Sequence, residues 1–280
     1  MQSTIFFRNF TNLDCAYIDD KGMLHGHSIL LSCYMKGQPT DSESVVLDFS
    51  TGKKQLKAII DDKETGLDHK LLIFKDSKYE IEYNEDRVHI TTPYLELLLP
   101  KNAIQLIDNF GAITNLVNEK INQGEQKYNC RINGSTKGYT DLNAKYFRYS
   151  HGLKFSSSWG CQNVCHGHFS FVEVLVPTGN IEVSDNKLAD EIAAYLDDAI
   201  LIYNPNIKSQ DNEKITVEYS TERGLFSATY KQPHKVIIFK TETTIEFIIE
   251  HIKEVFYNRL KGKLLRISEG LQKGAELYVE

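Results

Sequence analysis

The sequence predicts an α+β protein made of two tandem modules, each an antiparallel sheet with two helices packed on one face. The tripeptide His-Gly-His occurs at residues 25–27 and again at residues 166–168, half a chain length apart in 280 residues. A motif repeated at this period is typical of a duplicated module. Strands and helices are also predicted in the same mixed order in both halves, which favours helices on one face of a largely antiparallel sheet.

Apolar spacing predicts the elements of the first module, which we assign to residues 1–123. Leu56, Ile59 and Ile60 recur at helical spacing, and the turn residues Asn-Glu-Asp separate two apolar runs, as in a hairpin. The predicted elements are strands at 28–35, 45–49, 78–83 and 87–91, and helices at 51–62 and 102–122.

The second half repeats this order after a stretch rich in Gly, Asn, Lys and Thr. This stretch predicts a linker over residues 124–143 and a second module over residues 144–280. Leu188, Ile192 and Tyr195 lie on one face of a predicted helix. The predicted elements are strands at 145–151, 169–176, 215–219, 225–230 and 264–268, and helices at 185–195 and 244–260.

Composition excludes several classes of partner. The net charge of −6 gives no electrostatic footprint for nucleic acid or an anionic membrane. The N-terminal residues do not resemble a signal peptide, and no window approaches the roughly 20 apolar residues of a membrane span. Five cysteines without an export signal indicate reduced thiols. We therefore expect a cytoplasmic protein that binds neither nucleic acid nor membrane.

The second His-Gly-His predicts a zinc site. His166 and His168 lie two residues apart on a predicted strand, so both side chains point to one face. His151, on the preceding predicted strand, supplies a third ligand, and catalytic zinc sites use three protein ligands plus an open position. In the first half no histidine precedes His25, and the corresponding segment offers Asp14, Cys15 and Tyr17. We interpret that site as degenerate, with Asp14 or Cys15 as weak ligands at most.

Two other interpretations of the histidines stay open. His-Gly-His is also compatible with a turn that carries surface histidines, although two copies in register argue against this. A structural zinc site could instead use Cys161, Cys165, His166 and His168. Four ligands within eight residues make tetrahedral closure awkward.

These residues resemble the 6-pyruvoyltetrahydropterin synthase / 6-carboxytetrahydropterin synthase family, whose members have the tunnelling fold. The resemblance rests on FRYSHGL, Cys161 and HGHFSFVEV in the second half, and on VVLDFSTGKKQLKAIID and the Leu-Asp-His segment at 67–69 in the first. Thr244 and Glu246 match the family's Thr-x-Glu helix start, and Glu269 matches its last-strand glutamate. The motifs are spread over nearly the whole chain.

Each half departs from the family pattern in a different place. The second half has Leu-Asp-Asp at 196–198 where the family has Leu-Asp-His, and the first half has Pro-Lys-Asn-Ala at 100–103 where the family has Thr-x-Glu. The first half also lacks a convincing last-strand glutamate. In the family, the Asp-His pair comes from a neighbour of the subunit that carries zinc. The two halves therefore look like complementary parts of one composite site.

The resemblance implies a role for each site residue. His151, His166 and His168 would bind zinc, Glu269 would bind the pterin ring, and Thr244 and Glu246 would help to bind substrate. Cys161 would abstract a proton, with Asp68 and His69 as its acid–base partners. Cys165 is adjacent to His166 and so points to the opposite strand face, although the choice between Cys161 and Cys165 stays open.

The function implied is that of a zinc-dependent lyase acting on 7,8-dihydroneopterin triphosphate or a related dihydropterin. The product would be 6-carboxytetrahydropterin, a queuosine precursor, or 6-pyruvoyltetrahydropterin, and the sequence does not choose between them. The alternative is a homologue that binds a pterin or purine without turnover. Family modules form rings, so a homotrimer or similar homo-oligomer is expected.

Overall fold

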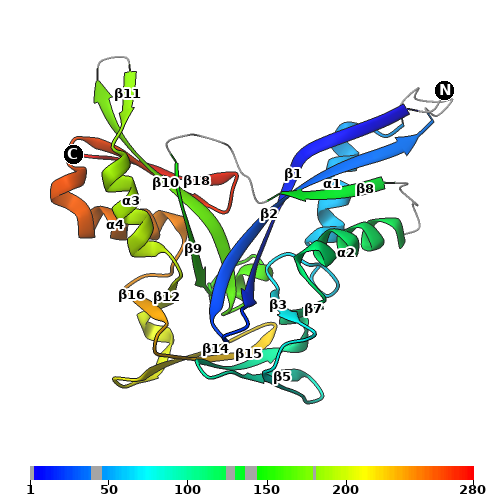
Figure 1. Cartoon of the computed structure of the whole chain (residues 1–280), viewed down its shortest axis with the longest axis horizontal. Helices are drawn as coiled ribbons and strands as arrows, with labels where there is room; N and C mark the ends of the chain where they lie inside the picture. The colour runs from blue at the N-terminus through cyan, green and yellow to red at the C-terminus, as the bar shows by residue number, and fades with distance from the viewer. Residues whose placement is uncertain (1–2, 39–45, 124–129, 136–143, 179–180) are drawn as a thin grey trace.

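The structure is a computed structural model, and it describes residues 3–38, 46–123, 130–135, 144–178 and 181–280. Two modules lie side by side above a third, shared sheet (Figure 1). Within the described part of the chain, no helix is both long and apolar enough to cross a membrane.

The first module is a five-stranded sheet with two helices on one face. Its strand order is β7-β3-β1-β2-β8, in which β1 and β2 form a long antiparallel pair and β3 and β7 add parallel strands. Leu56 of α1 and Val117 of α2 pack on Leu13, Ile29 and other apolar side chains of the sheet. The elements are β1 (Ser3–Ile18), β2 (Leu24–Gly37), α1 (Phe49–Ile60), β3 (Leu71–Phe74), β7 (Ile104–Ile107), α2 (Phe110–Gln123) and β8 (Cys130–Ser135).

The second module repeats this arrangement. Its sheet has the order β16-β12-β9-β10-β17-β18, with β11 also paired to β10, and helices α3 and α4 cover one face. The parallel pairs are again at one side of the central antiparallel pair. The elements are β9 (Lys145–His151), β10 (His166–Thr178), β11 (Ile181–Ser184), α3 (Asn186–Leu196), β12 (Ala199–Tyr203), β16 (Lys235–Phe239), α4 (Ile245–Leu260), β17 (Lys263–Glu269) and β18 (Lys273–Val279).

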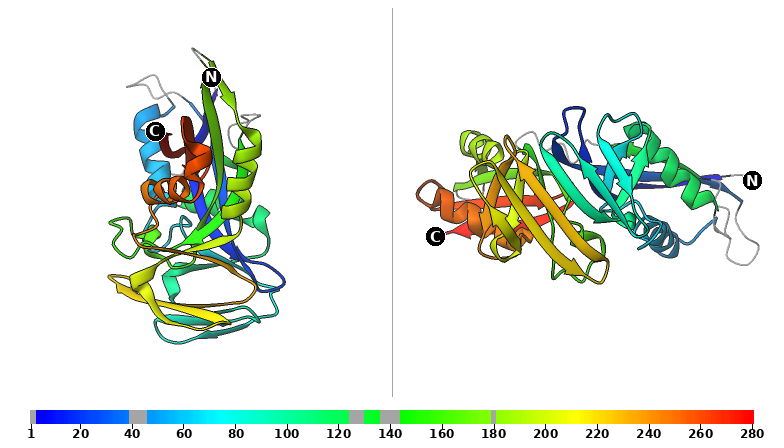
Figure 2. Two further views of the ribbon diagram at one scale, coloured as in Figure 1. Left: turned by 90° about the vertical axis from the view of Figure 1, so that its left-hand side faces the viewer. Right: turned by 90° about the horizontal axis from the view of Figure 1, so that it is seen from below.

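A third sheet joins the modules. Its order is β13-β14-β15-β6-β5-β4, so each module contributes three strands, which lie side by side when seen from below (Figure 2). The junction is the antiparallel pairing of Ser227–Tyr230 with Leu95–Leu98. Both modules also contribute to the core beneath this sheet, so their relative position is fixed by buried apolar contacts. The strands are β4 (Glu80–Tyr83), β5 (Arg87–Thr91), β6 (Leu95–Pro100), β13 (Ile207–Gln210), β14 (Lys214–Thr221) and β15 (Gly224–Lys231).

The two His-Gly-His segments meet where the modules contact one another. A Cβ atom on Gly26 would lie 2.1 Å from the carbonyl oxygen of Tyr149, and one on Gly167 would lie 2.6 Å from the Cα of Gly26. Real Cβ atoms do not approach other atoms this closely, so only glycine fits at either position. The repeated glycine is thus required by the close packing of β2 on β10, while the flanking histidines point elsewhere.

The α+β class is confirmed, and the two similar sheets with their helices are compatible with the predicted two-module repeat, with corrections in detail. The expected strand at 45–49 is wrong: residues 46–48 are not strand, Asp48 caps α1 by accepting from the Thr51 N–H at 2.8 Å, and Val45 lies outside the described residues. The expected helix at 102–122 begins only at Phe110, because residues 104–107 pair with β3. Neither sheet is antiparallel throughout.

The predicted linker contains a strand. Within residues 124–143, Cys130–Ser135 form β8, which pairs with β2, and 124–129 and 136–143 lie outside the described residues. The strand escaped prediction because ladder pairing, rather than an apolar run, holds it in place.

Candidate functional site

Three buried histidines converge at the start of the second module's central strand pair. His151 ends β9 and lies directly opposite His166 at the start of β10, and His168 follows on the same face. One nitrogen from each ring lies within 4.8 Å of the others. The Nε2 atoms of His151 and His168 are 3.2 Å apart, close to the ligand separation in a tetrahedral zinc site with Zn–N bonds of about 2.0–2.1 Å.

The Nδ1 atoms of His151 and His166 lie against backbone carbonyl oxygens. His151 Nδ1 lies 2.9 Å from the carbonyl oxygen of Thr243, and His166 Nδ1 lies 2.9 Å from that of Asn163. A carbonyl oxygen can only accept, so Nδ1 carries the proton in both rings and Nε2 presents a lone pair. His166 Nε2 is buried and has no hydrogen-bond partner. This is the arrangement of histidines that ligate a metal, and the residues therefore fit a zinc ion.

The protonation of these rings agrees with that fit. Burial, followed by repulsion from His168, lowers the pKa of His151 to about 3. Burial and the neighbouring His151 likewise hold the pKa of His166 well below its usual range. Both are therefore neutral near pH 7, which is the form that binds metal ions.

A carboxylate from the other module lies beside the third histidine, His168. Asp14 of β1 is buried, and its Oδ1 lies 3.2 Å from His168 Nδ1. Asp14 thus lies against the second module's histidine instead of beside His25 and His27, where a weak ligand was expected. The reason is strand alternation: Asp14 points away from the face on which Leu13 and Cys15 meet the helices. Burial opposes ionisation of Asp14, but His168 and His69 hold its pKa well below the usual range.

A thiol and a histidine from different modules lie beside this cluster. Cys161 Sγ, in a short 3-10 turn, is 3.4 Å from His69 Nε2, and His69 Nδ1 is 2.6 Å from Asp68 Oδ2. The ring of His69 lies 5.0 Å from that of His166 between centroids. The predicted site residues of the two halves are therefore brought together within one chain.

The environment polarises this pair. Burial raises the pKa of the Cys161 thiol, but the opposing attraction of His69 brings it to about 7. Burial alone would depress the pKa of His69, whereas the charges of Asp68 and Cys161 raise it well above its usual value. A thiolate is therefore accessible near neutral pH.

Backbone contacts fix the position of His69. Its φ of 59° is left-handed, a region that few residues other than glycine adopt. Its N–H donates to the Asp14 carbonyl at 2.6 Å, and its carbonyl accepts from Asn163 Nδ2 at 3.0 Å. A Cβ atom on Gly160 would lie 2.7 Å from His69 Cβ, so glycine is needed beside Cys161 for this approach. Cys165 lies apart from this pair, in the core beneath the shared sheet.

Residues 7–97 match the family model described as 6-pyruvoyl tetrahydropterin synthase. This similarity to the family covers less than half of the chain. The matched residues include Asp68 and His69, whereas the three-histidine cluster lies in the second half. No curated protein sequence matches the chain.

Several solved structures of 6-pyruvoyltetrahydropterin synthase are also similar. A catalytic residue mutant of the Plasmodium vivax enzyme is 20% identical, with a TM-score of 0.34. The Plasmodium vivax enzyme itself is 21% identical and the Plasmodium falciparum enzyme 18% identical, each with a TM-score of 0.33. Each match covers 49% of this chain and 99% of the other.

The residues expected to bind substrate lie at different distances from the histidines. Glu269 ends β17 with a side chain only 15% exposed, and it forms a 2.7 Å ion pair with Lys273, which the sequence analysis missed. Burial opposes its ionisation, but His168 and Lys273 lower its pKa. Thr244 precedes α4, and Glu246 is exposed in the first turn; it is the preceding Thr243 that contacts His151.

Sequence reasoning also missed Glu242. Both of its carboxylate oxygens are buried without a hydrogen-bond partner, and burial raises its pKa to about 7. Its signal in the sequence was only its position two residues before Thr244. A pocket of about 200 Å³ opens beside His69 and is also lined by Lys63, Trp159 and Arg223.

The first His-Gly-His occupies the position in the first module that the second His-Gly-His occupies in the second module. Asp198 corresponds to His69 and also has a left-handed backbone, with a φ of 53°. Its N–H donates to the backbone carbonyl of Arg148, as the N–H of His69 donates to the backbone carbonyl of Asp14. His25 Nδ1 lies 2.7 Å from Asp198 Oδ1. Tyr17 stands opposite His25 in register, as His151 stands opposite His166, and it stacks on His25. Among the described residues, no group around His25 meets the geometry of a metal site.

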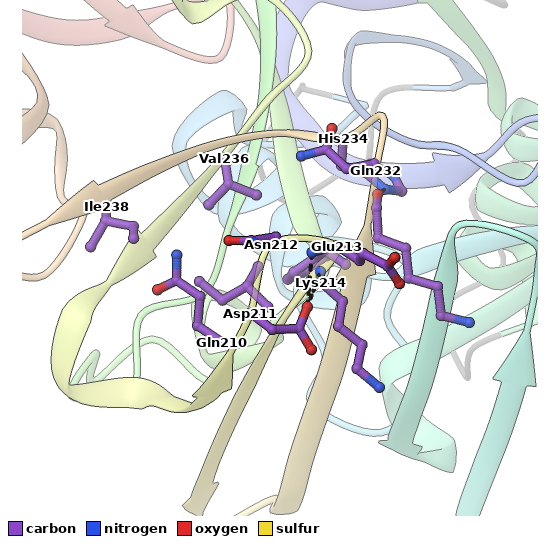
Figure 3. A pocket seen from close by; sticks show the side chains of 12 residues that line it. Gln210, Asp211, Asn212, Glu213, Lys214, Gln232, His234, Val236 and Ile238 are labelled. Atoms are coloured by element: carbon purple, nitrogen blue, oxygen red, sulfur yellow. Dashed lines mark hydrogen bonds between the residues drawn. The ribbon is translucent and has the colours of Figure 1, made fainter.

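A further pocket lies between the β13–β14 and β15–β16 turns (Figure 3). Its wall includes Asp211, Lys214 and His234, and none of its lining residues belongs to the histidine site. His234 Nε2 accepts from the Leu24 N–H at 3.2 Å, and its Nδ1 lies 3.1 Å from the Lys231 carbonyl. Both ring nitrogens are thus used to hold the fold.

Proposed function

We propose that the chain is a zinc-dependent pterin synthase-type lyase with one composite site formed by its two halves. The substrate would be 7,8-dihydroneopterin triphosphate or a related dihydropterin, and the product of the 6-carboxytetrahydropterin or 6-pyruvoyltetrahydropterin type. The observation that carries this proposal is the position of Cys161. Its thiol is hydrogen-bonded to His69 and lies beside the cluster of His151, His166 and His168. A protein that only binds pterin has no need of such a pair.

The metal would be held by His151, His166 and His168, and when bound it would polarise substrate hydroxyls and acidify the neighbouring C–H bonds. The Cys161 thiolate would accept a proton from the substrate carbon. His69 would move that proton onward from Nε2, while Asp68 fixes its tautomer through Nδ1. His69 itself is buried, which limits the access of water to its ring.

Glu269 would anchor the pterin by accepting bonds from a ring N–H and the amino group. In the structure its partner is Lys273, so the pterin would share or replace this ion pair. Thr244 and Glu246 would contact the substrate from the start of α4, because the same segment places Thr243 on His151.

We also propose the division into modules at 1–123 and 144–280, with β8 counted in the first sheet to which it pairs. The protein would form a homotrimer or a similar ring. Light scattering coupled to size-exclusion chromatography measures the mass of the assembly directly.

The test is release of triphosphate from 7,8-dihydroneopterin triphosphate by the zinc-loaded protein. One zinc per chain is expected, and two tight zinc ions would contradict a single composite site. His69→Gln should keep zinc and pterin binding but lose turnover by about 10²–10⁴-fold. Wild-type protein that binds zinc and pterin yet releases no triphosphate would establish the non-catalytic alternative.

A further inference from the structure

A second set of three potential ligands overlaps the histidine cluster. Cys161 Sγ and one ring nitrogen each of His69 and His166 also lie within 4.8 Å of one another. With Zn–N bonds of about 2.0–2.1 Å and Zn–S bonds of about 2.3 Å, tetrahedral ligands are about 3.6 Å apart. The measured Sγ–Nε2 distance of 3.4 Å is close to this value.

Each member of this set is already oriented for a metal. His69 Nδ1 is engaged by the Asp68 carboxylate and His166 Nδ1 by the Asn163 carbonyl, so both rings direct Nε2 inward. A carboxylate or carbonyl behind the ring is the usual support of a metal-binding histidine. His166 is fully buried, and its Nε2 has no partner within the protein.

The loop that carries the thiol is anchored to the first module, where His69 lies. Arg223 donates to the Trp159 carbonyl at 2.9 Å and to the Asn102 carbonyl at 3.1 Å. Asn163 bonds the carbonyls of His69 and Ala103, both at 3.0 Å. Cys161 is therefore held near His69 by bonds that a bound metal would not disturb.

We propose that the site offers a metal ion two alternative positions that share His166. The histidine position uses His151, His166 and His168, and the thiolate position uses His69, Cys161 and His166. The Nε2 atom of His166 has one lone pair, so the two positions exclude each other. A thiolate favours thiophilic divalent ions such as Cd²⁺, whereas three imidazoles suit Zn²⁺.

Occupation of the thiolate position would switch the protein off. Both groups to which we assign proton transfer, Cys161 and His69, would be metal ligands there. The pair of thiol and imidazole gives up one proton as the S–metal bond forms, and no atom changes oxidation state. The consequence for activity rests on the proposed function, whereas the thiolate position itself rests only on the distances and partners above.

The test uses the full chain, freed of metal and titrated with Cd²⁺ alone. We expect a thiolate-to-cadmium charge-transfer band in the ultraviolet that saturates at one ion per chain. Cys161→Ser should abolish the band, whereas the matched variant Cys165→Ser, at a fully buried thiol, should retain it. His69→Ala removes a direct ligand and should weaken Cd²⁺ binding by at least about 10-fold, the smallest loss typical of the partners behind a ligand.

One further variant separates this proposal from the proposed function. His151→Ala removes a ligand of the histidine position only, so it should lose zinc-dependent turnover but keep the cadmium band. Absence of the band in folded wild-type protein, its survival in Cys161→Ser, or its loss in His151→Ala would each overturn the thiolate position. None of these results depends on whether the protein turns over a pterin.

Discussion

The carboxylate of Asp14 provides a sharp test of how the first module supports the second module's metal site. Asp14 is 2% exposed, and its Oδ1 accepts from Ser28 and lies 3.2 Å from His168 Nδ1. Asp14→Asn keeps the size of the side chain and the two backbone bonds to Asp68 and His69. It places an amide NH₂ or an uncharged oxygen opposite the imidazole.

The expected effect is on zinc affinity. Ser28 and His168 Nδ1 approach the same oxygen, Oδ1, so an uncharged amide oxygen would take its place and the negative charge that favours a proton on His168 Nδ1 would be lost. Loss of such an outer carboxylate lowers metal affinity by about 10–100-fold, which corresponds to about 1.4–2.8 kcal/mol. Zinc affinity is measured by competition with a chromophoric chelator, and circular dichroism checks that the variant is folded.

Asp19→Asn is the matched control. Asp19 Oδ2 lies 3.2 Å from Nε2 of His25, at the first His-Gly-His, so the Asp19 variant should bind zinc as tightly as wild type. If folded Asp14→Asn protein binds zinc with wild-type affinity, or if Asp19→Asn weakens zinc equally, the assignment of Asp14 as the positioning group of His168 fails.

Two other predictions concern contacts between the modules. Gly160→Ala would place a methyl group 2.7 Å from His69 Cβ and separate the thiol from the imidazole, so we expect zinc content to be retained and turnover to fall at least tenfold; unchanged turnover would contradict the proton-transfer role. The pair of His25 and Asp198 predicts a pH-dependent stability. Burial opposes ionisation of both groups, but their mutual hydrogen bond raises the pKa of His25 and lowers that of Asp198. The contribution of His25 is full below its unfolded pKa of about 6.5 and is lost as pH rises through its higher folded pKa, and that of Asp198 is lost as pH falls through its depressed pKa. Asp198→Asn should therefore lower the free energy of unfolding, measured by urea titration, most between about pH 4 and 6.5. The loss should be no more than about 1 kcal/mol, because the carboxylate is half exposed. A difference that grows above pH 8 would refute this.

Much of the site could be predicted from sequence because its ligands lie on regular strands. His166 and His168 share a face by strand alternation, and His151 ends the strand that pairs with them. The pairing of His69 with Cys161 was expected only through the family resemblance, and the structure places them 3.4 Å apart. Asp14 was expected beside the first His-Gly-His, but it lies beside His168 of the second. Strand alternation gives the face on which a side chain lies but not which module that face contacts.

The long elements were also predictable, whereas the short strands were not. Helices α1, α3 and α4 have apolar residues at helical spacing, which is a local property. Strand β7 is only four residues long and lies where local spacing predicts a helix, and β8 lies where composition predicts a linker. Such strands are stabilised by ladder bonds to β3 and β2, which no local pattern encodes.

Repeated motifs and local periodicity were enough to predict a tandem repeat, the α+β class and the histidine cluster, whereas the role of the thiol came from the family resemblance. Which half contributes to which site depends on how the two modules pack. The contact of Gly26 with Gly167 and the shared sheet bring the modules together so that Asp14, Asp68 and His69 face the second set of histidines. The same contact pairs the first His-Gly-His with Asp198. The physical reason is that side-chain direction is local, while the neighbour a side chain meets depends on close packing between residues far apart in the chain.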